Sequence, residues 1–253
     1  MRIAIIGCMV LQREISYLAA QSKHIVRVWW QRQGLHDTPD ILRAELQKNI
    51  DAIERENDLL RPSLKFEAII LAYGLCSNGV IGLRSRTLPI VVPRCDDCIS
   101  LFLGSADRYR KLFHALPGVY WYNRGWIEQA FTPSKENYRI QREEYAEEYG
   151  EENADYLMEC TNNWMTNYQY CGYITCPLGD CAEHEAYARQ AAEDFHWKFE
   201  KVEGDMSFIH AVVNGPWDDK QFLTCPPHSK IEAEYSNKKF CSVPCEVDDW
   251  TKK

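Results

Sequence analysis

Residues 2–7, RIAIIG, are the stretch that decides the fold. The run is apolar and rich in β-branched side chains, which is typical of a strand buried on both faces of a parallel sheet. Residues 10–21 follow with apolar side chains at helical spacing, and residues 24–30, HIVRVWW, have the composition of a second strand. A strand, a helix and another strand in this order predict a parallel sheet that is covered by helices.

The same alternation continues outward from this stretch. The clearest helix is expected at residues 36–60, where apolar side chains recur on one face. Another helix is expected at residues 99–116, with a break at Gly104. The remaining strands of this part are expected at residues 65–74, 88–93 and 118–123.

A shift in composition follows, because residues 134–170 are highly charged and rich in tyrosine, which predicts one long exposed helix. Strand-like and helix-like runs then resume. We therefore expect an α/β fold with parallel sheets and helices on both faces, in two Rossmann-like lobes with a cleft between them. The expected regions are a first α/β lobe at 1–133, a charged helical insertion at 134–168, and a second α/β lobe with the tail at 169–253.

The composition limits the classes of partner. The chain has 253 residues, of which 45% are apolar, and a formal net charge of −8. An acidic chain without a basic block is a poor ligand for nucleic acid, since neutralising phosphates needs clustered Lys and Arg. The N-terminal apolar run is too short for a secretory signal, and no run reaches the ~18 apolar residues of a membrane-spanning helix. We therefore expect a soluble, cytoplasmic protein with no nucleic-acid or membrane partner.

Eleven cysteines are many for such a chain. Their number is odd and no export signal is expected, so disulfides are disfavoured, and metal ligation, Fe–S ligation and thiol chemistry gain weight. The alternative is that many of these cysteines are small buried hydrophobic residues.

Four of the cysteines follow predicted strands. Cys8 comes after the first strand, Cys76 after the third, and Cys95 and Cys98 after the fourth. If these strands are parallel, all four thiols lie at one edge of the sheet, beyond the carboxyl ends where ligands bind in such folds. Thiolates gathered at one point repel each other unless a cation compensates their charge. Cys8, Cys76 and Cys98 form a set that fits a 4Fe–4S cluster with one iron open to a small ligand.

Other interpretations of the thiols stay open. A zinc ion takes four Cys or His ligands in a structural site, and Cys95 with Cys98 has the spacing of a redox pair. The thiols are otherwise buried bystanders. Cys95 is either an additional metal ligand or a bystander. Cys176 and Cys225 also end predicted strands, and we expect them to face the same site across the cleft as further metal ligands.

An anionic ligand is expected beside the thiols. Arg94 lies at the end of the fourth strand and Arg124 follows the fifth, and a guanidinium binds carboxylate or phosphate with two hydrogen bonds. The loop at residues 73–83 contains Gly74 and Gly79, which predict backbone N–H groups turned toward an anion. The alternatives are a structural ion pair for Arg94 and a turn that needs positive φ for the glycines.

The residues also resemble a known family. The segments that carry the resemblance are IIGCMVLQREI (5–15), LHDTPDILRAELQKNID (35–51), AIILAYGLCSNGVIGL (68–83), PRCDDCISLFLGS (93–105), PGVYWYNRGWIE (117–128) and VEGDMSFIHAVVNGPWDDKQFLTCPP (202–227). They are similar to the domain-of-unknown-function family numbered sixteen thirty-eight, found in anaerobes, often near genes of corrinoid-dependent methyltransferases.

The resemblance implies that Cys8, Cys76 and Cys98 match the family's cysteines and that Arg94 matches its arginine. It also implies anaerobic one-carbon metabolism, with proteins of a corrinoid methyltransferase system as partners. This chain has Asp96 where the family pattern has histidine. Our first hypothesis is a cytoplasmic Fe–S or metal protein that binds a small anion. The alternatives are a non-catalytic accessory protein that binds a corrinoid, and a structural zinc protein.

Overall fold

The computed structural model describes residues 1–234, 236 and 238–246, and the chain divides into two units. Unit 1 consists of Met1–Ala106 and Asp205–Lys253, and unit 2 of Asp107–Gly204. These bounds differ from the three regions expected from the sequence, 1–133, 134–168 and 169–253. The reason is that a strand from the C-terminal part returns to the first sheet, whereas the strand at Val119–Tyr122 joins a second sheet.

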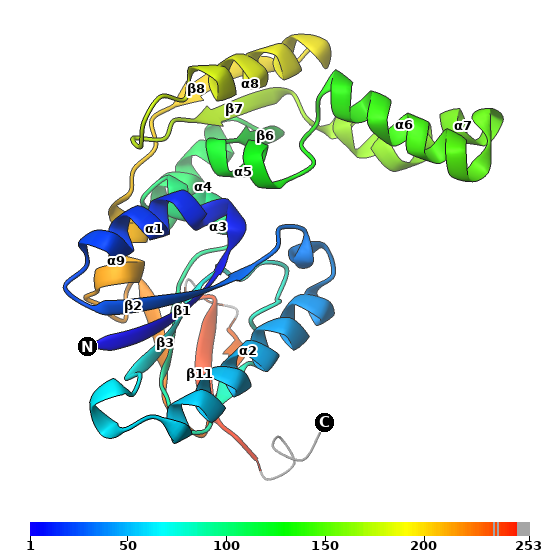
Figure 1. Ribbon diagram of the computed structural model, residues 1–253. Helices are drawn as coiled ribbons and strands as arrows, with labels where there is room; N and C mark the ends of the chain where they lie inside the picture. Colours follow the sequence, from blue (N-terminus) through cyan, green and yellow to red (C-terminus); the bar gives the residue numbers. More distant parts are fainter. Residues whose placement is uncertain (235, 237, 247–253) are drawn as a thin grey trace. The chain divides into compact units, whose positions relative to one another are not determined.

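Unit 1 contains a five-stranded sheet (Figure 1) with the order β2-β1-β3-β5-β9. Strands β1, β2, β3 and β5 are parallel, as the sequence predicted, and β9 is antiparallel to β5. The bounds are β1 (Arg2–Cys8), β2 (Ile25–Gln31), β3 (Ala68–Ala72), β5 (Ile90–Pro93) and β9 (Phe222–Cys225).

Helices cover both faces of this sheet. Helices α1 (Gln12–Gln21) and α9 (Ser207–Asn214) lie on one face, and α2 (Pro39–Leu59) lies on the other (Figure 1). On the α2 side, Ile6, Leu71 and Val92 of the sheet pack with Leu46 and Ile50 of the helix. This arrangement confirms an α/β fold with helices on both faces of a parallel sheet.

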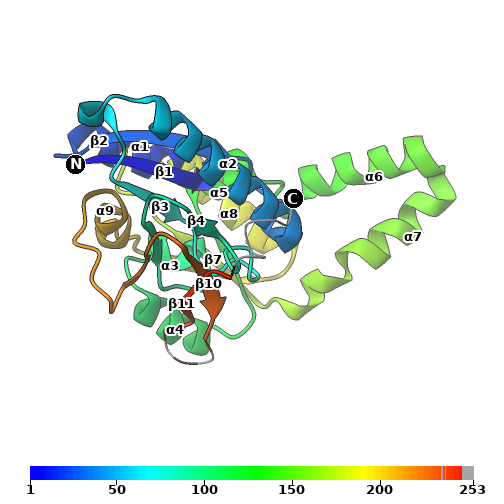
Figure 2. The same ribbon diagram turned by 90° about the horizontal axis from the view of Figure 1, so that it is seen from below.

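A small antiparallel sheet shares the α2 side (Figure 2). It has the order β11-β10-β4, and its Ile231 and Phe240 belong to the same buried cluster as the helix. This sheet is not expected from the sequence, because the C-terminal stretch has no clear period. The bounds are β4 (Arg84–Ser85), β10 (Ser229–Ala233) and β11 (Phe240–Pro244).

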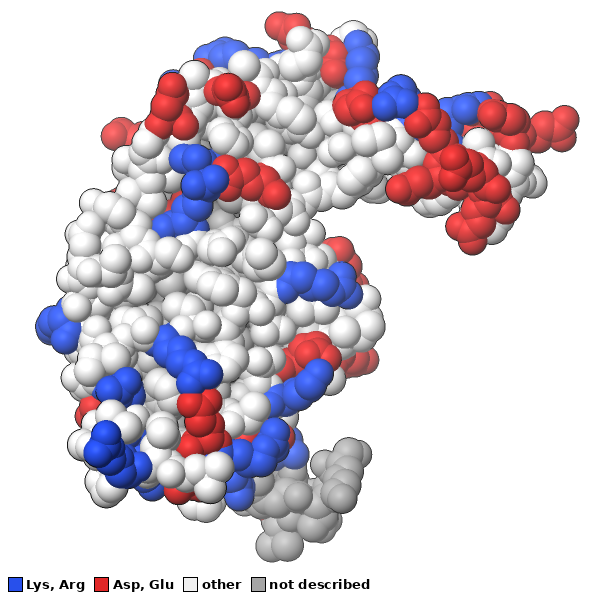
Figure 3. Space-filling view, in the orientation of Figure 1, with Lys and Arg blue, Asp and Glu red and all other residues white. Residues whose placement is uncertain are grey.

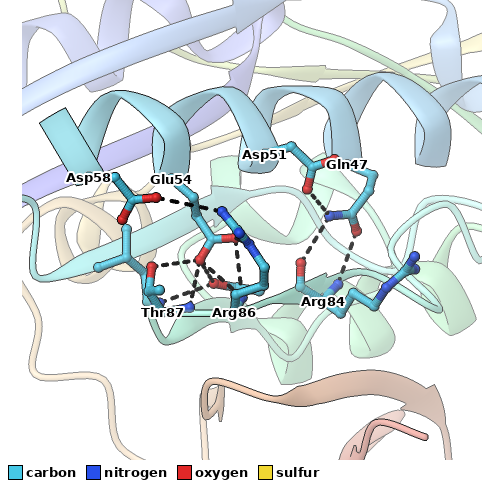
Figure 4. A network of polar contacts seen from close by, with 9 residues as sticks. Gln47, Asp51, Glu54, Asp58, Arg84, Arg86 and Thr87 are labelled. Carbon is cyan, nitrogen blue, oxygen red and sulfur yellow. Dashed lines mark hydrogen bonds and ion pairs between the residues drawn. The ribbon is translucent and has the colours of Figure 1, made fainter. Parts of the chain in front are cut away.

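A buried carboxylate fastens α2 to the segment that precedes β5 (Figure 4). Glu54, 1% exposed, accepts hydrogen bonds from the Ser85 hydroxyl at 2.8 Å, the Thr87 N–H at 2.6 Å and the Thr87 hydroxyl at 2.7 Å. The Arg86 N–H donates a further bond at 3.0 Å. Burial raises the pKa of Glu54, but these hydrogen bonds lower it by more, so its pKa lies below the ordinary value. The network therefore holds a charged group inside the protein.

Unit 2 contains a three-stranded parallel sheet of order β6-β7-β8. Helix α8 (Ala182–Asp194) covers one face through Ala188 and Ala191, which pack with Tyr122. Helix α4 (Ala106–Ala115) reaches the other face, where the Tyr109 ring meets the Trp121 ring edge-on. The strand bounds are β6 (Val119–Tyr122), β7 (Tyr170–Ile174) and β8 (Lys198–Val202).

The charged region forms two antiparallel helices (Figures 1 and 2), α6 (Lys135–Tyr149) and α7 (Glu151–Asn162). The prediction of one long helix was wrong, because Gly150 has a φ of +84° and breaks it. The two helices carry nine acidic and three basic side chains, a net formal charge of −6 (Figure 3). Among the described residues, α6 contains no buried residue and α7 buries Ala154 and Met158, so the hairpin is largely solvated.

The break expected at Gly104 is present, since α3 (Cys98–Phe102) ends before it and α4 begins after it. The remaining helical segments are α5 (Arg124–Gln129) and the short 3-10 turns η1 (Met9–Leu11), η2 (Leu35–Asp37), η3 (Pro62–Leu64) and η4 (Asn163–Asn167). Within the described ranges, no helix combines the length and the apolar character needed to cross a membrane.

Candidate functional site: a thiol-lined sheet edge

The carboxyl ends of β1, β3 and β5 lie side by side in unit 1. The parallel register pairs Gly7 with Ala72 at the end of β1 and β3. The next residues along the two strands are Cys8 and Tyr73, and both pack against the buried cluster on the α2 side. The parallel sheet therefore places Cys8 at the edge that the sequence predicted.

Two loops at this edge are bonded to each other. The Leu75 N–H donates to the Cys95 carbonyl and the Cys76 N–H donates to the Asp96 carbonyl, each at 2.8 Å. Gly74 permits this contact, because a Cβ there would lie 2.7 Å from the Asp97 backbone nitrogen. The loop that follows β3 and the loop that follows β5 are thus held in direct backbone contact.

The backbone that carries Cys76 is in an unusual conformation. Cys76, Ser77 and Asn78 have φ values of 44°, 56° and 67°. The left-handed region costs an ordinary residue roughly 1–2 kcal/mol, and three such residues in a row persist only where the surrounding contacts impose them. Strain of this kind concentrates at functional sites, so this loop is a candidate part of a functional site.

The four thiols differ in exposure. Cys8, Cys76 and Cys98 are partly buried, whereas Cys95 is fully buried. Cys98 is the first residue of α3, and Asp97 caps this helix by accepting a hydrogen bond from the Ile99 N–H at 3.0 Å. The three partly buried thiols are the set that the sequence predicted as ligands.

All three thiols influence the ionisation of Tyr73. Burial raises the pKa of Tyr73 well above its ordinary value, and the next contributions come from Cys8, Cys76 and Cys98. All three sulfur atoms are therefore near enough to the Tyr73 hydroxyl to influence its ionisation. Tyr73 was not among the residues expected from the sequence, although its place directly after β3 was a signal for it.

Burial keeps most of these thiols protonated. It raises the pKa of Cys8, although the backbone N–H groups of Val10 and Met9 oppose the effect. Burial, with the nearby Asp97, raises the pKa of Cys76 to about 12. A cation that binds here must displace protons, because the metal ligand is the thiolate.

As the side chains lie, no three or more His, Cys, Asp and Glu residues in the described ranges are grouped so that they could hold a metal ion. A cysteine side chain turns about a single torsion between three staggered positions. Joint ligation by Cys8, Cys76 and Cys98 therefore requires a change of side-chain rotamer.

The Arg94 guanidinium forms hydrogen bonds with backbone carbonyls of the protein. Its Nε donates to the carbonyls of Asp219 and Phe222 at 3.0 and 3.1 Å, and its Nη1 donates to those of Lys238 and Phe240 at 2.7 and 2.5 Å. The guanidinium thus ties the end of β5 to the C-terminal strands. This geometry favours a structural role over the expected binding of an anion.

The two glycines of the loop also have packing roles. Gly74 allows the backbone contact described above, and a Cβ at Gly79 would lie 2.4 Å from Cδ2 of Leu42 in α2. Close packing explains both residues without an anion.

Cys225 lies at the opposite end of β5 from the other thiols. Because β9 is antiparallel to β5, Cys225 pairs with Ile90, the first residue of β5, while Cys95 follows the last. The pKa of Cys225 is raised to about 12, mainly by burial and to a smaller extent by the neighbouring Cys245 and Cys241. The expectation that Cys225 joins the site was wrong, since the sequence did not reveal the direction of β9.

Arg124 and Cys176 belong to unit 2. The Arg124 guanidinium donates to Glu128 and to the Leu178 carbonyl, each at 2.9 Å, and lies 3.9 Å from the Cys181 sulfur. Arg124 thus anchors the loop between β7 and α8, and Cys176 lies in that loop.

The fold and the thiol-lined edge define the class: a cysteine-rich α/β protein with three thiols at the carboxyl ends of parallel strands. Residues 30–213 match the family described as "Protein of unknown function (DUF1638)", and the chain belongs to this family. The matched range includes Tyr73, Cys76 and Cys98 but not Cys8. No curated protein and no solved structure matches the chain.

Proposed function

We propose that the chain binds a thiophilic metal, as an Fe–S cluster or a single ion, through Cys8, Cys76 and Cys98. The observation that carries the proposal is that three partly buried thiols follow the carboxyl ends of neighbouring parallel strands and that all three influence the ionisation of Tyr73. Thiolates are the ligands preferred by Fe–S clusters and by soft cations.

The strained loop supports the same assignment. Cys76 and the two residues after it keep a costly left-handed backbone, and two backbone hydrogen bonds join their loop to the one that carries Cys95 and Asp96. Such a clamp fixes the position of the Cys76 backbone relative to the strand ends. Under this proposal the side chains of Cys8 and Cys98 turn toward this fixed point when a cation binds.

Three protein ligands would leave one coordination position for a small ligand, which we propose to be anionic. A metal with an open position can act as a Lewis acid or in redox chemistry. Cys95 is fully buried, and under this proposal it does not bind the metal. An accessory role in corrinoid-dependent methyl transfer rests on the resemblance alone and stays a prediction.

The test is anaerobic purification followed by a visible spectrum and metal analysis. A brown protein with about four irons per chain is expected for a cubane cluster, and a stoichiometric single metal for a mononuclear site. Joint replacement of Cys8, Cys76 and Cys98 by alanine should abolish binding. Cys160→Ala is the matched control, because Cys160 is an exposed thiol on α7 of unit 2. Unchanged metal content in the triple variant would refute the proposal.

A stoichiometric zinc content with four thiolate ligands would favour the structural zinc protein instead. That outcome requires Cys95 as the fourth ligand, so Cys95→Ala separates the two cases. Under our proposal this variant keeps its metal.

A further inference from the structure

The Tyr73 hydroxyl is a buried polar group that makes no hydrogen bond of ordinary geometry within the described part of the chain. The side chain is 4% exposed, and its buried oxygen makes no hydrogen bond among the residues that the structure describes. A buried hydroxyl without a partner destabilises the folded state, and phenylalanine would fill nearly the same volume without this cost. Packing alone therefore does not explain a tyrosine here.

The surroundings of the hydroxyl point to its missing acceptor. Cys8 follows Gly7, the last β1 residue paired with β3, and Tyr73 follows Ala72, its partner in β3, so the two lie side by side on the α2 side. The Cys8 sulfur interacts with the hydroxyl, but the contact does not meet ordinary hydrogen-bond geometry. A neutral thiol is a weak acceptor, whereas a thiolate is a strong one.

We propose that Tyr73 is a positioning residue that donates a hydrogen bond to the Cys8 sulfur once this sulfur is a thiolate bound to a thiophilic cation. The inference rests on the proposed function. The hydroxyl is then satisfied in the loaded state only, so it favours binding of the metal. It also withdraws charge from the sulfur, and hydrogen bonds to ligating sulfur atoms set metal affinity and reduction potential.

The test compares Tyr73→Phe with the wild-type chain, using Co²⁺ as the probe under anaerobic conditions. We expect the variant to bind Co²⁺ roughly tenfold more weakly, the lower end of the range for loss of a partner to a metal ligand. Its sulfur-to-cobalt charge-transfer band should move to longer wavelength, because the sulfur loses a hydrogen bond. In the metal-free chain the urea midpoint should stay the same or rise, since an unsatisfied group is removed.

Tyr122→Phe is the matched control. Tyr122 is fully buried in unit 2, and its hydroxyl donates to the Pro133 carbonyl at 2.7 Å. Its loss should lower the urea midpoint and leave the Co²⁺ affinity and spectrum unchanged. A purely structural Tyr73 would behave like Tyr122.

Each outcome bears on the inference. Equal Co²⁺ affinity and an unshifted band in Tyr73→Phe would overturn it while leaving the proposed function intact. A urea midpoint that falls as far as in Tyr122→Phe would overturn it as well. If the wild-type chain binds no Co²⁺, the role of Tyr73 is overturned, whereas the proposed function is judged by the metal content after anaerobic purification.

Discussion

Replacing Gly74 by alanine tests the contact between the two loops at the thiol-lined edge. A Cβ at this position would lie 2.7 Å from the Asp97 nitrogen and 2.8 Å from the Cys95 oxygen. Both neighbours are backbone atoms, so neither can yield by a change of rotamer, and the loops must separate. Separation weakens the two 2.8 Å hydrogen bonds donated by Leu75 and Cys76.

The size of the effect follows from these contacts. Overpacking a well-packed site costs about 1–3 kcal/mol, and each weakened hydrogen bond costs about 0.5–1.5 kcal/mol. Alanine also restricts the unfolded chain, which offsets about 0.4–1 kcal/mol. We therefore expect Gly74→Ala to lower the free energy of unfolding by about 3 kcal/mol, measured by urea denaturation followed by circular dichroism.

Gly7→Ala is the control for this substitution. A Cβ at Gly7 would meet side-chain atoms of Trp30 and Ala72 at 3.3 and 3.4 Å, which can shift by a few tenths of an ångström, so the loss should be about 1 kcal/mol. If Gly74→Ala destabilises the chain no more than Gly7→Ala does, the reasoning about the loop contact is refuted.

Three further predictions concern buried groups. Because hydrogen bonds lower the pKa of Glu54, its carboxylate stabilises the fold above the ordinary carboxyl pKa, and this contribution is lost as the pH falls through the lowered value. Glu54→Gln should lower the free energy of unfolding by about 2 kcal/mol at pH 7. On acidification the free energy of unfolding of this variant should fall less than that of the wild type, measured by urea titrations at stepped pH, and an equal fall in both chains would contradict this. Arg94→Lys should lower the free energy of unfolding by about 3 kcal/mol, since one ammonium cannot replace a guanidinium bonded to four carbonyls, and an unchanged urea midpoint would contradict that. Cys98→Ala should weaken metal binding and Cys95→Ala should leave it unchanged, in metal titrations of both variants; weaker binding in Cys95→Ala alone would contradict the assignment of Cys98 as a ligand.

Much of the first sheet could be predicted from the sequence. Apolar β-branched runs such as residues 2–7 have few alternatives to a buried parallel strand, and the helix at Pro39–Leu59 follows from its apolar stripe and its N-terminal proline. Two features escaped prediction. The direction of β9 depends on tertiary pairing, and the short strands of the small sheet are made by contacts with α2 rather than by a local pattern.

The site was predicted in part, for the same physical reason. Parallel strands bring their carboxyl ends to one edge, so the positions of Cys8, Cys76 and Cys98 could be inferred from strand ends alone. The hydrogen bonds of Arg94 could not be inferred, because the carbonyl groups that accept them lie more than a hundred residues away in the sequence. Tyr73 could not be predicted, because an aromatic residue after a strand is usually part of the hydrophobic core. Only the structure shows that its hydroxyl has no acceptor among the described residues.

The central claim is that thiols from the ends of β1, β3 and β5 bind one metal. X-ray absorption at the zinc edge of the anaerobically prepared, zinc-loaded chain tests it most directly, because Zn–S distances of about 2.3 Å differ clearly from Zn–N and Zn–O distances. We expect three sulfur ligands in the wild-type chain and two in Cys8→Ser. A zinc shell without sulfur, or an unchanged sulfur count in Cys8→Ser, would contradict it.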